Sequence, residues 1–120
     1  MDAQELEHSL RMFTGTEEWF RYPLNRNMLF TDGVKFFADN AGGGAYWFLD
    51  IVATEHMPLQ MAGEEFMVIK LKVEGSKATI TTEDGNDRVL TQRRIDYTDC
   101  PEGEWTFYLV DGTLLLPSEY

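Results

Sequence analysis

The chain has 120 residues, of which 43% are hydrophobic, and its aromatic residues comprise eight Phe, five Tyr and three Trp. This length and apolar content predict one packed domain, residues 1–120, and exclude wholesale disorder. Its 21 acidic residues outnumber ten Lys and Arg, so the formal net charge is −11. Because such a surface repels phosphate backbones and anionic membranes, we expect neither direct nucleic-acid binding nor membrane binding. A protein partner with a basic surface is favoured, although acidic charge also simply keeps small proteins soluble.

Cysteine usage and the N-terminal residues bear on the cellular compartment. Cys100 is the only cysteine, which excludes an intramolecular disulfide and hence a small disulfide-stabilised secreted scaffold. The N-terminus begins with acidic residues, and no segment approaches the roughly 18 apolar residues of a membrane span. We therefore expect a cytoplasmic protein.

The first half of the chain, residues 1–57, is predicted to be mainly helical. Asp2 and Glu5 have the spacing of a capping box, and the apolar residues that follow recur at helical spacing up to Gly15. Thr16 is placed to cap a second short helical turn, in which Trp19 and Phe20 are the expected core anchors. A further helix is predicted over residues 32–41 from the period of its apolar residues.

Three glycines at residues 42–44 are predicted to form a bend before a strongly apolar helix that ends near Pro58. Only Tyr46, Asp50 and Thr54 form a polar stripe on that helix, so it should be mostly buried. The glycines resemble a phosphate-binding loop, but no strand precedes them and no Gly-Lys-Ser/Thr follows. An interhelical bend is therefore the preferred interpretation.

The second half, residues 66–116, is predicted to consist mainly of strands. Residues 66–73 alternate between apolar and polar, residues 77–82 are rich in β-branched side chains, and an Asp-Gly turn joins residues 105–110 to 113–116. Helices followed by hairpin-linked strands predict an α+β fold. We expect N-terminal helices on one face of a C-terminal antiparallel sheet of four or five strands.

Acidic residues in the turn at residues 83–87 could be taken for calcium ligands, but the ordered ligand series of an EF-hand is missing. A hairpin turn explains the Asp, Gly and Asn residues without an ion, so no metal and no cofactor is predicted. The candidate partner contacts are the acids of this turn and the polar stripe of the apolar helix. They are Glu83, Asp84, Asp87, Tyr46 and Asp50.

Reactive side chains are few, since His8, His56 and Cys100 are the only histidines and cysteine and lie far apart in sequence. No catalytic residue is assigned. The alternative to a binding protein is a small enzyme that uses Cys100 or His56 with a carboxylate. Arg93 and Arg94 are adjacent on a predicted strand, so their side chains should point to opposite faces of the sheet.

Four segments together resemble a family of short bacterial proteins of unknown function. They are residues 13–19 (FTGTEEW), 29–34 (LFTDGV), 44–50 (GAYWFLD) and 111–120 (DGTLLLPSEY), and Tyr22 belongs to the same pattern. Members of that family are often met on plasmids, phages and other mobile DNA. The resemblance covers nearly the whole chain and implies a bacterial or phage cytoplasmic origin, and it supplies no catalytic residue.

These observations predict a small acidic protein that acts by protein–protein interaction. A more specific hypothesis is a phage- or plasmid-encoded inhibitor or nucleic-acid mimic directed at a host defence system. A third possibility is a homo-oligomeric structural protein, such as a homodimer, built through an edge strand or the apolar residues 114–116.

Overall fold

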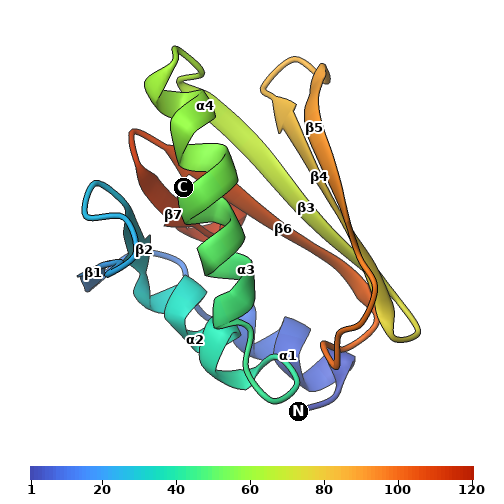
Figure 1. Cartoon of the computed structure of the whole chain (residues 1–120). Helices are drawn as coiled ribbons and strands as arrows, with labels where there is room; N and C mark the ends of the chain where they lie inside the picture. Colours follow the sequence, from blue (N-terminus) through green and yellow to red (C-terminus); the bar gives the residue numbers. More distant parts are fainter.

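The computed structural model describes residues 1–120, and its helices cover one face of a seven-stranded sheet (Figure 1). The helical elements are α1 (Ala3–Leu10), α2 (Asp32–Asn40), α3 (Tyr46–Ile51), the π-helix η1 (Val52–His56), α4 (Met57–Met61) and the 3-10 turn η2 (Pro117–Glu119). The strands are β1 (Trp19–Arg21), β2 (Leu29–Thr31), β3 (Phe66–Glu74), β4 (Lys77–Asp84), β5 (Val89–Ile95), β6 (Gly103–Val110) and β7 (Thr113–Leu115). None of the helices has the length and apolar character needed to cross a membrane.

The sheet is larger than predicted and mixed, with the strand order β1-β2-β7-β6-β3-β4-β5. The α+β class is confirmed, but the expectation of four or five antiparallel strands is wrong. Strands β1 and β2 come from the half predicted to be mainly helical, and β2 pairs in parallel with β7. Each of these strands has only three residues, which is too short to display a period of two.

The helical turn predicted after Thr16 is therefore a strand, β1, at one edge of the sheet. Phe20 is half-buried against Phe30, with ring centroids 5.4 Å apart, as expected of a residue that packs on the core. Trp19 points the other way and is 56% exposed, so it is not a core anchor. Successive side chains of a strand point to opposite faces of the sheet, so Trp19 and Phe20 cannot both pack on the core.

The predicted long strands are confirmed, and alternation divides the sheet into two faces. On β3, Met67, Ile69 and Leu71 are fully buried under the helices, and we call this side the helix-covered face. Lys70 and Lys72 alternate with the buried residues and lie on the opposite side, the open face. Part of the open face is covered by the last residue of the chain, Tyr120, whose ring packs against Phe66 and Tyr108.

Phe107 is the centre of the helix-covered face. Its ring lies 4.9 Å from that of Phe37 in α2 and 4.8 Å from that of Phe48 in α3, measured between centroids. All three side chains are fully buried within a hydrophobic cluster of 26 residues. This aromatic contact joins the two central helices to the middle of the sheet.

The apolar helix continues past its predicted end, since α3, η1 and α4 form one uninterrupted helical stretch through Pro58. Proline lacks an N–H group and clashes with the preceding turn, so a regular helix would normally end there. Here the turn before Pro58 is widened to a π-helix, in which the Met57 N–H donates to the carbonyl of Val52. The widened turn accommodates the proline, and the helix runs to Met61.

The glycine triplet forms the bend between α2 and α3, and a side chain from the distant β5–β6 connection holds it in place. The Gly43 N–H donates to the Asp99 carboxylate at 2.8 Å. Gly42 has φ +59°, and a Cβ there would collide with Asp99. The Asp99 carboxylate thus holds the bend closed. It accepts the Gly43 N–H group that a phosphate-binding loop would offer to its ligand.

Candidate partner-binding site

A hollow of about 480 Å³ lies between the β1–β2 connection and the first turns of α3. Its lining residues are Tyr22, Pro23, Leu24, Phe30, Tyr46 and Asp50. We call it the tyrosine–aspartate hollow. It contains two of the residues predicted from sequence as partner contacts, Tyr46 and Asp50, and its walls are otherwise aromatic or aliphatic. Leu24 is 57% exposed at its rim, so the rim offers apolar surface to a ligand.

A backbone hydrogen bond closes the β1–β2 connection, and side-chain hydrogen bonds hold it against the helix. The Tyr22 N–H donates to the Met28 carbonyl at 2.9 Å, and the Asn25 amide donates to the Ala53 carbonyl at 3.2 Å. Phe30 faces the helices from β2, and its ring meets that of Tyr22 edge-on with centroids 5.8 Å apart. The hollow is therefore preformed by a short hairpin docked on the polar stripe of α3.

Two tyrosine hydroxyls fix the carboxylates around the hollow. The Tyr22 hydroxyl donates to Asp50, and the Tyr46 hydroxyl donates to Asp39 at 2.6 Å. Asp39 also accepts a hydrogen bond from Lys35 at 2.7 Å, whereas the second oxygen of Asp50 has no partner in the chain. The hollow thus offers one carboxylate oxygen to a ligand.

The ionisation of these groups follows from burial and from their partners. Burial and the hydrogen bond to Asp39 raise the pKa of Tyr46 to about 12. Burial, together with the bond to Asp50, also raises the pKa of Tyr22. Lys35 and Tyr46 lower the pKa of Asp39. At neutral pH both tyrosines are protonated donors, so the negative charge of the site resides on the carboxylates.

This arrangement suits a cationic side chain with an apolar stem. A lysine or arginine could lay its methylene groups against Leu24 and the aromatic rings and direct its charge to Asp50. Charge-assisted hydrogen bonds of that kind are stronger than neutral ones. No group of three or more His, Cys, Asp or Glu residues is placed to hold a metal ion anywhere in the structure.

The acidic turn, the other predicted contact region, joins β4 to β5 and uses its acids mainly within the chain. Glu83 pairs with Lys70 at 3.1 Å, and Asp84 pairs with Arg88 at 3.0 Å. Asp84 also accepts the backbone N–H groups of Asn86 and Arg88, and these bonds lower its pKa. Asp87 adopts φ 66° in the turn. The structure therefore brings Tyr46 and Asp50 together but leaves the acidic turn as a separate, partly neutralised feature.

His56 and Cys100, the residues of the enzymatic alternative, are both buried and contact different neighbours. The His56 Nε2 atom lies 2.9 Å from the Thr82 hydroxyl, its Nδ1 atom has no partner, and burial lowers its pKa to about 4. Cys100 contacts Thr98 and the carbonyl of Ala41, and burial raises the pKa of its thiol. At neutral pH the imidazole is neutral and the thiol is protonated.

The two adjacent arginines point to opposite faces, as predicted. Arg93 forms an ion pair with Glu55 of the π-helix, on the helix-covered face. Arg94 lies on the open face, opposite Thr79 of β4.

Sequence reasoning missed Tyr22, Leu24 and Phe30. The pairing of β2 with β7 places these residues beside α3, and nothing in the local sequence reveals that pairing. In the sequence, only the polar stripe with Tyr46 and Asp50 marks the site.

Comparison with known proteins gives one family match. A family model described as "Family of unknown function (DUF6876)" matches residues 4–120. Neither the curated proteins nor the solved structures contain a match to the chain.

Proposed function

The chain belongs to this family of unknown function, and from the geometry of its surface we propose that it is a protein-binding module. Its contact site is the tyrosine–aspartate hollow, and its partner presents a lysine or arginine from a basic surface. The observation that supports this most directly is the pairing of exposed Leu24 with the unengaged oxygen of Asp50. The net charge of −11 adds long-range attraction for such a partner.

The more specific proposal is an inhibitor or nucleic-acid mimic, made by a phage or plasmid and directed at a host defence system. It rests on the net charge and on the resemblance to proteins of mobile DNA. Several acids are engaged in ion pairs and turns, so we place recognition at the hollow first and at the acidic turn second. A mimic should lose affinity steeply as salt is added, because it replaces a polyanion.

The test compares capture of host proteins by the wild-type chain with capture by Leu24→Ser and Asp50→Asn variants. Glu65→Gln, an equal charge change at an exposed residue that lies outside the hollow and forms no ion pair, is the matched control. We expect at least a tenfold weaker affinity for the captured protein in both hollow variants and an unchanged affinity in the control. Leu24→Ser should fold normally because the side chain is exposed. Equal capture by all four proteins would overturn the proposal.

The enzymatic alternative would need His56 or Cys100 to reach a substrate, yet both are buried and neutral. Its test is a Cys100→Ala, His56→Ala double variant, whose cellular effect should be lost if either residue is catalytic. A homo-oligomer would use the free edge of β5, and a mass that rises with protein concentration would support it.

A further inference from the structure

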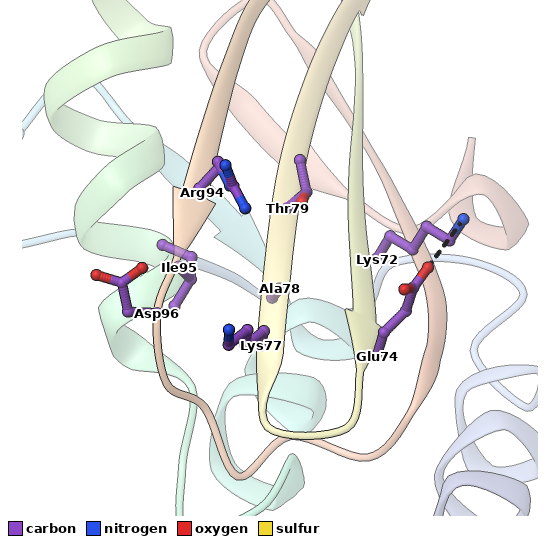
Figure 2. Close-up of a pocket in the computed structure, with 8 residues that line it drawn as sticks. All are labelled: Lys72, Glu74, Lys77, Ala78, Thr79, Arg94, Ile95 and Asp96. Carbon is purple, nitrogen blue, oxygen red and sulfur yellow. Dashed lines mark ion pairs between the residues drawn. The ribbon is translucent and has the colours of Figure 1, made fainter.

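A second hollow, of about 230 Å³, lies on the open face where β3, β4 and β5 run side by side (Figure 2). Its polar lining residues are Lys72, Glu74, Lys77, Thr79, Arg94 and Asp96. Three of them are cationic, although acidic residues outnumber basic ones by 21 to ten in the whole chain. This local excess of positive charge is opposite in sign to the protein as a whole.

The strand register fixes the positions of the polar groups. Thr79 of β4 lies directly opposite Lys72 of β3 on one side and Arg94 of β5 on the other. Side chains directly opposite each other in a sheet have Cβ atoms about 5 Å apart, so the three form one row across the open face. Threonine is short, and it leaves space above its hydroxyl between two long cationic side chains.

Two of the cations have no partner within the chain. Lys77 and Arg94 form no ion pair and no side-chain hydrogen bond, and the Thr79 hydroxyl is equally unengaged. Figure 2 shows Arg94 and Lys77 both lying over the gap between β4 and β5. Lys72 turns to the other side, toward Glu74, with which it pairs at 3.2 Å.

We propose that Arg94, Lys77 and Thr79 form a binding site for a single oxyanion group, a phosphate or a carboxylate. The guanidinium supplies parallel N–H donors that match two oxygens of such a group. The Lys77 ammonium adds a point charge, and the Thr79 hydroxyl adds one more donor. None of these groups has to give up an internal bond to engage the ligand.

The surroundings limit the size and charge of the ligand. Glu74 and Asp96 flank the hollow, so a second anionic group on the same ligand would meet a carboxylate. The net charge of −11 repels polyanions over longer distances. The site therefore selects one isolated oxyanion and rejects a nucleic-acid backbone.

Titration by NMR tests this site with two probes, inorganic phosphate and acetate, at constant ionic strength. We expect saturable shifts of the Thr79 backbone amide and the Arg94 side-chain Nε–H signals. Arg94→Gln should weaken binding at least tenfold. Arg26→Gln removes the same charge from another exposed arginine without an ion pair, and it should leave binding unchanged.

The two probes distinguish the source of the ligand. Saturation by phosphate alone assigns a phosphate-bearing ligand, and saturation by acetate alone assigns a carboxylate, while saturation by both supports a general oxyanion site. Shifts that fail to saturate with either probe would overturn the proposal. An equal loss in the Arg94 and Arg26 variants would overturn it as well, because binding would then depend on net charge alone.

Discussion

The two faces of the sheet carry opposite kinds of residue although the same strands supply both. On β3, Ile69 and Leu71 are fully buried under the helices, while Lys70 and Lys72 alternate with them on the open face. The helix-covered face joins the parts of the chain into one core, and the polar side chains buried there, His56 and Thr82, are uncharged at neutral pH. The open face keeps charged groups, and two of its cations, Lys77 and Arg94, form no ion pair. The difference assigns most of the packing that stabilises the fold to the helix-covered face, and it leaves charged side chains exposed to solvent on the open face.

Replacing one aromatic residue in the core should show the difference in stability between the two faces most clearly. Phe107→Ala removes the ring that contacts both Phe37 and Phe48, and we expect the free energy of unfolding to fall by about 3–5 kcal/mol. Thr106→Ala, on the open face of the same strand, should change it by less than about 0.5 kcal/mol. Urea denaturation of both variants measures the two values. Similar losses of unfolding free energy in the two variants would show that the helix-covered face contributes no more to stability than the open face.

Lowering the pH should reduce the free energy of unfolding, because His56 is buried in its neutral form on the helix-covered face. The unfolded chain binds a proton at this residue near its ordinary pKa of 6.5, whereas the folded chain does so only near 4. Protons therefore favour the unfolded state between these values, and stability should fall by roughly 3 kcal/mol as pH drops from 6.5 to 4.

The His56 contribution is obtained as a difference between two proteins. Urea denaturation of the wild type and of His56→Gln across this pH range should give a shallower pH dependence for the variant. Identical slopes would mean that the imidazole is not buried in its neutral form. His8→Gln is the control, because His8 is exposed on α1.

The smallest of these effects concerns the corner that ties the helices to the β5–β6 connection. Gly42→Ala would place a methyl group against Asp99 at a φ of +59°, and we expect a loss of about 1–3 kcal/mol. Gly15→Ala is the matched control, since a Cβ there meets nothing within 4 Å. Thermal unfolding should separate the two variants. A stable Gly42→Ala protein would contradict the close approach of Asp99.

The sequence predicts the long elements because each carries its own period. Strand β3 repeats apolar residues at every second position over nine residues, so its buried face is evident. Strands β1 and β2 have three residues each, and β2, with which β1 pairs, depends on residues 113 and 114, far along the chain. The same reason explains why Tyr46 and Asp50 could be selected as candidates while Tyr22 and Phe30 could not. The first two interrupt a helical pattern, and the others reach the hollow only through the sheet.

The carboxylate of Asp99 in the glycine bend shows that part of the acidic composition serves the architecture. Other carboxylates play the same part, and each accepts a backbone N–H group at a helix start, a turn or a loop. They include Asp2, Asp84, Glu102 and Glu119. A hydrogen bond from an uncharged N–H group does not cancel the charge of a carboxylate, so the structural role of these acids leaves the net charge of −11 unchanged. Attempts to raise the isoelectric point by neutralising acids indiscriminately would remove the groups that shape the connections.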